Sequence, residues 1–121
     1  MASRYVLLVE QDPHLSNLLD LFLHGRGFEV NVASTPAEAM RLAAARPPDV
    51  VVIGPSAPGG DLLPRQLGTL LDALAVDHRE VPQIRLEGSF RPRDVAEAVR
   101  LAIRQRQTEP PLSDESSLPA A

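Results

Sequence analysis

The sequence predicts a doubly wound α/β domain, in which a four-stranded parallel sheet carries helices on both faces. Residues 5–9 and 50–53 are uninterrupted apolar runs, which is typical of strands buried on both faces. Residues 28–32 and 83–87 alternate apolar and polar side chains, which is typical of strands with one wet face. Amphipathic segments lie between these runs. The pattern therefore predicts two central and two edge strands, in the order 2-1-3-4.

The first two helices are predicted from their N-terminal signals. Asp12 is expected to cap a helix that begins with Pro13. Thr35 and Glu38 have the spacing of a capping box, which opens a second, shorter helix. Pro47 is expected to end that helix, because proline cannot continue the helical hydrogen-bond pattern.

Two further helices are predicted from stripes of apolar residues at helical spacing. One follows the loop after Ile53, and Pro64 fits its first turn. The other begins after Ser89 or Arg91 and is expected to run to about Arg106. The stripes consist of Leu63, Leu67, Leu70, Leu71 and Leu74 in the former and Val95, Val99, Ala102 and Ile103 in the latter.

The 121 residues are enough for one domain with a single core. We predict this domain at residues 1–106. Residues 107–121 combine prolines, acids and serines with little apolar surface, so they are expected to form a disordered tail or linker. The sequence leaves open whether the domain is the N-terminal piece of a longer regulator.

Composition excludes several kinds of chemistry. The chain has no cysteine, which rules out disulfides and thiolate nucleophiles, and every basic residue is arginine, which rules out a Schiff-base or phosphate-binding lysine. No apolar run is long enough to span a membrane, so a cytoplasmic location is expected. The net charge of -4 argues against nucleic acid as the main partner.

A crevice is expected where the strand order reverses, beyond the carboxyl ends of the two central strands. Glu10, Gln11 and Asp12 follow the first of these strands, and Gly54 follows the other. Glycine has no side chain with which to attack, ligate or donate a proton. Two nearby carboxylates, those of Glu10 and Asp12, make a weak cation site without a third oxygen ligand. We therefore expect neither a bound metal nor a cofactor.

The segments VLLVEQDPHLSNLL and PPDVVVIGPSAPGGD resemble the beginning and the middle of a response-regulator receiver domain. The resemblance covers about residues 4 to 87 and, weakly, the last helix. It implies a flavodoxin-like sheet and a pocket with five parts. These are an acidic pair that binds Mg²⁺, an aspartate that accepts a phosphoryl group, a serine or threonine, and a lysine.

The chain departs from this pattern at most of the matching positions. Glu10 matches the first acid, but Gln11 replaces the second and Gly54 replaces the phosphoacceptor. Glu87 stands where the hydroxyl belongs, and Arg91 is the nearest equivalent of the lysine. The resemblance therefore implies a degenerate receiver, or pseudo-receiver, that is not phosphorylated. Its degenerate pocket comprises Glu10, Gln11, Asp12, Gly54, Glu87 and Arg91.

A whole helix and strand of the receiver pattern are missing between Glu87 and Arg91, because the intervening segment is too short for a crossover. The fourth strand should therefore be an open edge beside the last helix. Pro82 is expected to withhold a backbone donor there and so discourage strand pairing. We expect a protein partner, or a second copy in a homodimer, to bind the outward face of the last helix. The candidate interface comprises Gln83, Arg85, Glu97, Leu101 and Arg104.

The sequence thus favours a phosphorylation-independent, receiver-like interaction module in bacterial signal transduction, rather than an enzyme. An alternative from another class is a small metal- or nucleotide-dependent enzyme that transfers phosphoryl groups by means of Glu10 and Asp12. Turnover of a nucleotide would distinguish this enzyme from an interaction module.

Overall fold

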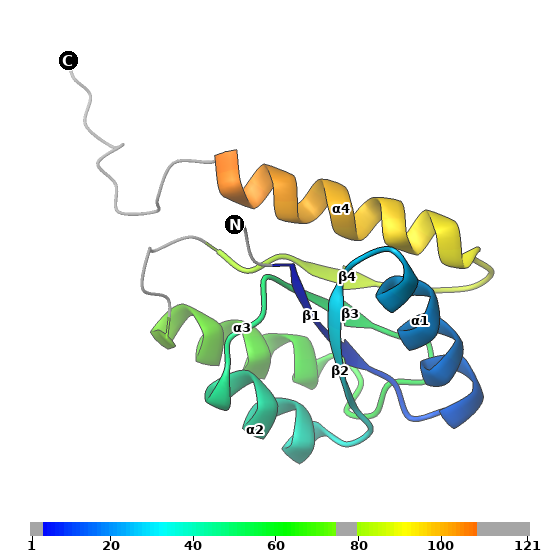
Figure 1. Cartoon of the computed structure of the whole chain (residues 1–121). Coiled ribbons are helices and arrows are strands. Elements are labelled where there is room, and N and C mark those ends of the chain that lie inside the picture. The colour runs from blue at the N-terminus through cyan, green and yellow to red at the C-terminus, as the bar shows by residue number, and fades with distance from the viewer. Residues whose placement is uncertain (1–3, 75–79, 109–121) are drawn as a thin grey trace.

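The computed structural model describes residues 4–74 and 80–108 of the chain. Strands and helices alternate along these residues (Figure 1). The elements are β1 (Tyr5–Val9), α1 (Pro13–Gly25), β2 (Glu29–Ala33), α2 (Pro36–Ala45), β3 (Val50–Ile53), α3 (Leu62–Leu74), β4 (Gln83–Arg85) and α4 (Pro92–Thr108). The last helix continues past Arg106 to Thr108, and the rest of the predicted tail, residues 109–121, lies outside the described residues.

The four strands form one parallel sheet in the order β2-β1-β3-β4, which confirms the predicted topology. Every residue of β1 and β3 is buried, as expected for central strands covered on both faces. Val9 lies opposite Ile53, so the two central strands end side by side. The residues that follow them, Glu10 and Gly54, therefore meet at the same edge of the sheet.

Helices cover both faces of the sheet (Figure 1). Successive residues of a strand point to opposite faces, so β1 contributes Val6 and Leu8 to one core and Leu7 and Val9 to the other. The core beneath α1 and α4 contains Leu19, Leu23, Val95, Val99 and Ile103. The core beneath α2 and α3 contains Ala39, Ala43, Leu63, Leu67 and Leu71. Burial of each such leucine stabilises the fold by about 1.5–3 kcal/mol.

No helix or strand lies between β4 and α4. Residues 86–91 connect these two elements directly, as the spacing of Glu87 and Arg91 predicts. Leu86, the first residue of this connection, is still bound to the sheet, because its N–H donates to the carbonyl of Ile53 over 2.8 Å. In the part of the chain that the structure describes, β4 is therefore an edge strand with α4 as its next neighbour in sequence.

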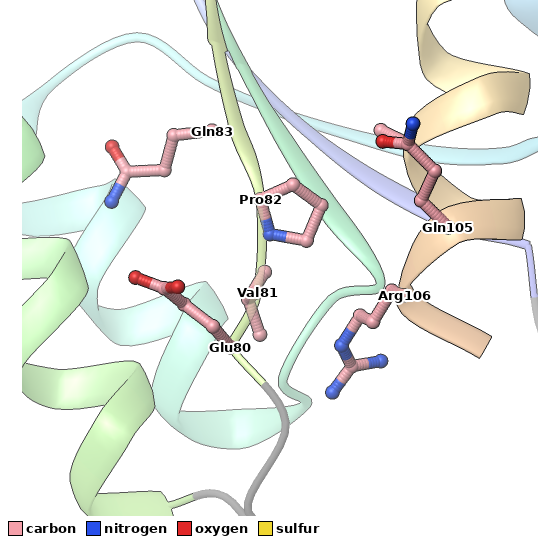
Figure 2. Close-up of a pocket in the computed structure, with 7 residues that line it drawn as sticks. Glu80, Val81, Pro82, Gln83, Gln105 and Arg106 are labelled. Atoms are coloured by element: carbon pink, nitrogen blue, oxygen red, sulfur yellow. The ribbon is translucent and has the colours of Figure 1, made fainter. Parts of the chain in front are cut away.

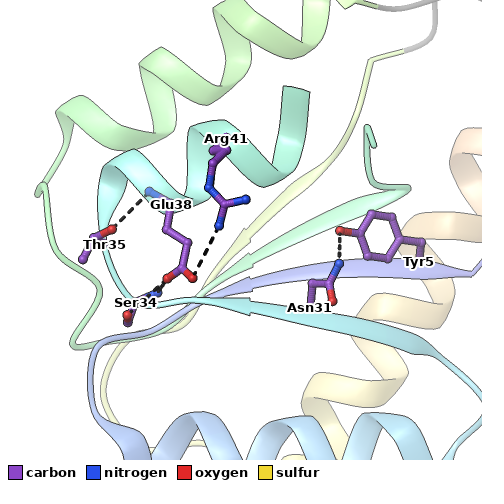
Figure 3. A network of polar contacts seen from close by, with 6 residues as sticks. All are labelled: Tyr5, Asn31, Ser34, Thr35, Glu38 and Arg41. Carbon is purple, nitrogen blue, oxygen red and sulfur yellow. Dashed lines mark hydrogen bonds and ion pairs between the residues drawn. The ribbon is translucent and has the colours of Figure 1, made fainter. Parts of the chain in front are cut away.

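The cap of α2 differs in one bond from the predicted capping box (Figure 3). Thr35 is the N-cap, and its hydroxyl oxygen accepts from the N–H of Glu38 over 3.1 Å. The carboxylate of Glu38 reaches back to the N–H of Ser34, at 2.9 Å, rather than to that of Thr35. The two orphan donors are still satisfied, but the second lies one residue before the cap.

This bond makes the stability of α2 depend on pH. The hydrogen bond from the Ser34 N–H holds the pKa of the Glu38 carboxyl below its ordinary value of 4.5. A carboxyl whose pKa is lower in the folded than in the unfolded state stabilises the fold above the unfolded pKa, and this contribution is lost as the pH falls through the folded pKa. We expect an NMR titration to give Glu38 a depressed pKa, and Glu38→Gln to remove its share of the acid sensitivity. A pKa of Glu38 at or above 4.5 would contradict this bond.

Candidate functional site

The candidate site lies at the carboxyl ends of the central strands β1 and β3, which meet at one edge of the sheet. The backbone of both residues that follow these strands continues the sheet. The Glu10 N–H donates to the carbonyl of Ala33 over 3.0 Å, and the Gly54 N–H donates to that of Val9 over 2.8 Å. The sheet therefore fixes the Cα atoms of Glu10 and Gly54 beside each other.

The side chain of Glu10 is a charged group inside the protein, because the residue is only 1% exposed. Its Oε2 accepts from the N–H of Asp12 over 2.8 Å, and its Oε1 accepts from the N–H of Ser56 over 3.1 Å. A buried carboxylate is costly unless such donors compensate it. Glu10 therefore joins the loop that follows β1 to the loop that follows β3.

Gly54 has no room for a side chain as long as Glu10 adopts this conformation. A Cβ atom at position 54 would lie 1.9 Å from Oε1 and 2.9 Å from Cδ of Glu10, well inside any real contact. The close approach, and not an unusual backbone angle, explains the glycine. The carboxylate of Glu10 thus fills the space that the side chain of residue 54 would otherwise occupy.

Asp12 caps α1, as predicted. Its carboxylate accepts from the N–H of His14 over 2.9 Å, and Pro13 follows at the first helical position. The side chain of Gln11, between the two acids, is exposed to solvent. Within residues 4–74 and 80–108, no three His, Cys, Asp or Glu side chains are grouped so that they could hold a metal ion. Glu10 and Asp12 use their oxygens on backbone N–H groups instead.

A crevice of about 300 Å³ opens beside Gly54, between the loops that follow β3 and β4 rather than those that follow β1 and β3. Of the predicted pocket residues, Gly54 and Glu87 line this crevice, and Glu10, Gln11, Asp12 and Arg91 do not. Arg85, which lines the crevice, forms ion pairs with Asp61 over 2.8 Å and with Glu87 over 3.8 Å. Glu87 lines the crevice, as its predicted position requires, but its side chain is 77% exposed. Arg91 instead pairs with Asp94 in the first turn of α4, over 3.2 Å. The residues that line the crevice are Ile53, Gly54, Pro55, Ala57, Gly60, Arg85, Leu86, Glu87 and Gly88.

Two contributors to this site were not predicted. Ser56 acts through its backbone N–H, which every residue except proline possesses, so the sequence carries no signal for it. Asp61 pairs with Arg85 across two elements, and only the pairing of β3 with β4 brings them together. The sequence shows an acid, Asp61, in the loop after β3, but it does not show that Arg85 is the cation that pairs with it.

The predicted interface does not form one surface. Leu101 is 43% exposed on α4, as expected. The side chain of Gln83, however, donates to the carbonyl of Pro64 at the start of α3, over 3.0 Å, and Arg85 pairs with Asp61 before the same helix. Gln83 and Arg85 therefore point to the α3 face of the sheet, whereas α4 lies on the other face.

The physical reason is the alternation of side chains along β4. Ile84 and Leu86 face the core beneath α4, so their neighbours must face the opposite way. Of the α4 residues in the predicted interface, Glu97 is bound to Arg100 within the helix, and this hydrogen bond lowers the pKa of the Glu97 carboxyl. Arg104 is exposed.

The expectation for Pro82 is also wrong. Its carbonyl accepts from the N–H of Val51 over 3.0 Å, so its peptide groups are directed to β3. The donor that proline lacks is therefore missing on the paired side of β4 and not on the open side. Pro82 does not protect the free edge of the sheet.

No helix in the described residues is long and apolar enough to cross a membrane. No protein-family model matches the chain. Over 48 residues, 40% of its length, the chain is 44% identical to the transcriptional regulatory protein KdpE of two Mycobacterium tuberculosis strains, CDC 1551 / Oshkosh and ATCC 25618 / H37Rv. The match spans 21% of KdpE, so it involves about a fifth of that relative.

Solved structures resemble the whole domain. A CheY-like response regulator receiver domain protein from Methanospirillum hungatei JF-1 matches with a TM-score of 0.69 and 16% identity, over 87% of this chain and 97% of that one. A response regulator receiver domain protein from Clostridium thermocellum matches with a TM-score of 0.66 and 19% identity, over 85% of this chain and 96% of that one. The receiver domain of the hybrid histidine kinase CckA matches with a TM-score of 0.65 and 20% identity, over 82% of this chain and 98% of that one. Together with the strand order 2-1-3-4, these likenesses show that the chain has the fold of a response-regulator receiver domain.

Proposed function

We propose that the chain is a receiver-like module of bacterial two-component signalling that accepts no phosphoryl group and acts through protein–protein contacts. The observation that carries this proposal is the position of Glu10. Its buried carboxylate fills the space of a side chain at position 54, and Gly54 offers no acceptor oxygen of its own.

Phosphoryl transfer to a protein needs a nucleophile, and usually a metal and a further cation that neutralise the phosphoryl charge. Glu10 is a poor substitute nucleophile, because both of its oxygens accept from backbone N–H groups and the side chain is closed off from solvent. Arg85, a cation that lines the crevice, is already paired with Asp61. Glu87, which lines the crevice, adds a negative charge.

The likenesses support a role in signalling. KdpE is a transcriptional regulatory protein, and the structural neighbours are receiver domains of response regulators and of a histidine kinase. We propose a protein partner in the cytoplasm. The acidic net charge of -4 makes nucleic acid an unsuitable partner for this domain.

The geometry does not favour the alternative enzyme. Such an enzyme would need the carboxylates of Glu10 and Asp12 to face a metal or nucleotide. Each carboxylate instead accepts from a backbone N–H, that of Glu10 from Asp12 and Ser56 and that of Asp12 from His14.

Intact-mass spectrometry after incubation with Mg²⁺ and acetyl phosphate tests the absence of phosphorylation. We expect no phosphoryl adduct on the wild type, while a receiver domain with its aspartate is modified under the same conditions. Gly54→Asp alone should also remain unmodified, because its Cβ would collide with Glu10 and because Gln11 and Glu87 still replace the second acid and the hydroxyl of a receiver pocket. A stoichiometric adduct that hydroxylamine removes would contradict the proposal, and turnover of ATP with Mg²⁺ would favour the enzyme instead.

A further inference from the structure

We propose that two copies of this chain pack through α3, on the face of the sheet opposite α4. The two α3 helices would run antiparallel across a two-fold axis, and Leu62 of each copy would enter a groove between α2 and α3 of the other. The inference goes beyond the proposed function, which requires a protein contact but specifies no surface.

One face of α3 is directed to solvent. Leu63, Leu67 and Leu71 point to the core beneath the helix, and the residues on the opposite face are exposed. Leu62, at the start of the helix, is 58% exposed. The exposed face consists of Leu62, Arg65, Thr69, Asp72 and Ala73, which recur at helical spacing.

A mostly apolar groove of about 570 Å³, the α2–α3 groove, borders this face where α2 lies beside α3 (Figure 1). Met40 contributes to it from α2, and Leu70 and Ala73 contribute from α3. Met40 and Leu70 are half-buried, so an apolar side chain that enters the groove would remove further apolar surface from water. The groove is lined by Met40, Arg65, Gln66, Thr69, Leu70 and Ala73.

A second groove, of about 390 Å³, lies beside β4 and is less suited to an apolar side chain (Figure 2). It is formed by residues 80–83 and the last turns of α4. Polar side chains make up most of its lining. Figure 2 shows Val81 and Pro82 between the side chains of Gln83 and Glu80 on one side and those of Gln105 and Arg106 on the other.

The charges on the exposed face of α3 are complementary to themselves. Arg65 and Asp72 lie on the same side of the helix, about 10 Å apart along its axis, which is too far for them to pair with each other. Neither forms an ion pair within residues 4–74 and 80–108. In an antiparallel pair of α3 helices centred between Gly68 and Thr69, Arg65 of each copy lies opposite Asp72 of the other. The two-fold axis therefore produces two ion pairs.

The same register brings Leu62 to the α2–α3 groove. Measured along the helix, Leu62 of one copy comes within about 3 Å of the level of Ala73 of the other, and Ala73 lines the groove. Thr69 lies at the axis, where its short side chain lets the two helices approach to the distance of about 8–10 Å that is typical of packed helices. One register thus satisfies both the charges and the leucines, which favours a second copy over a helix of another protein as the occupant.

We expect this dimer to be weak. One helix from each copy and two inserted leucines bury less surface than a stable interface of standard size, so association is expected at about 0.1–1 mM. At the micromolar concentrations of unfolding experiments the chain is then a monomer. The stability of each variant can therefore be measured separately from its dimerisation.

Sedimentation velocity of the full chain, up to millimolar concentration, tests the dimer. We expect the wild type to approach twice its monomer mass of 13.1 kDa. Leu62→Arg removes the inserted side chain and is expected to weaken dimerisation by about tenfold or more. Leu21→Arg is the matched control, because Leu21 is a leucine of α1 that is 65% exposed on the other face of the sheet, and it should leave dimerisation unchanged. Circular dichroism melting curves check that each variant folds.

An exchange of charges tests the register. Arg65→Asp and Asp72→Arg should each weaken self-association by about tenfold, because two ion pairs become two contacts between like charges. An equimolar mixture of these two variants should dimerise again, because each copy then supplies the charge that the other needs.

A wild type that stays monomeric overturns the inference and favours a helix of another protein as the occupant of the groove. A dimer that Leu62→Arg and Leu21→Arg weaken equally overturns it as well, and so does a mixture of the two charge variants that stays monomeric. A monomer that also takes no phosphoryl group would overturn this dimer and leave the proposed function standing.

Discussion

Gly54→Ala is expected to lower the free energy of unfolding by about 2–4 kcal/mol, although it adds a single methyl group. The new Cβ would lie 1.9 Å from Oε1 of Glu10. Glu10 must then leave its place, and its buried carboxylate loses the N–H groups of Asp12 and Ser56 or keeps them at the cost of a distorted sheet. Denaturant unfolding followed by circular dichroism measures the loss.

Gly68→Ala is the matched control. Gly68 lies inside α3, and a Cβ there would meet Nε2 of Gln83 at 3.5 Å, which is an ordinary contact. Alanine is a better helix former than glycine, so this variant should gain up to about 1 kcal/mol. The same substitution is thus expected to lower the free energy of unfolding at Gly54 and to raise it at Gly68.

A double-mutant cycle assigns the effect to Glu10. In a Glu10→Ala background the obstacle is gone, so adding Gly54→Ala should cost much less than it does in the wild type. We expect a coupling energy of about 1–3 kcal/mol between positions 10 and 54. If the losses in free energy of unfolding of the two single variants simply add up in the double variant, Glu10 does not occupy the space above Gly54.

The sheet could be predicted because burial and periodicity agree along each strand. Continuous apolar runs identified β1 and β3 as central, and alternation identified β2 and β4 as edges. Element ends were less certain. The fourth strand was predicted through Glu87 but ends at Arg85, where the backbone turns toward Gly88, whose φ of 67° suits glycine.

The candidate site was only half predictable. The missing side chain at Gly54 is visible in the sequence, but the reason for it is a contact with Glu10 that depends on how β1 pairs with β3. The misplaced interface has a similar origin. Ile84 and Leu86 face α4, so Gln83 and Arg85 must face away from it. The sequence alone, however, does not show which face of the sheet the last helix covers.

Asp49→Ala is expected to lower the free energy of unfolding by about 2–3 kcal/mol, because this carboxylate ties the end of α4 to the start of the sheet. Its Oδ2 accepts from the N–H of Tyr5 over 2.8 Å, and its Oδ1 pairs with Arg106 over 3.3 Å. Both side chains of the pair are less than a fifth exposed, at 17% for Arg106 and 16% for Asp49, so water cannot fully replace the lost contacts.

Asp72→Ala, at an exposed position of α3, is the matched control and should change stability by no more than about 0.5 kcal/mol. If Asp49 anchors α4, its loss should speed hydrogen exchange in the last turns of that helix more than in α1. Equal losses in Asp49→Ala and Asp72→Ala would mean that apolar packing of Val99 and Ile103 alone holds α4 on the sheet.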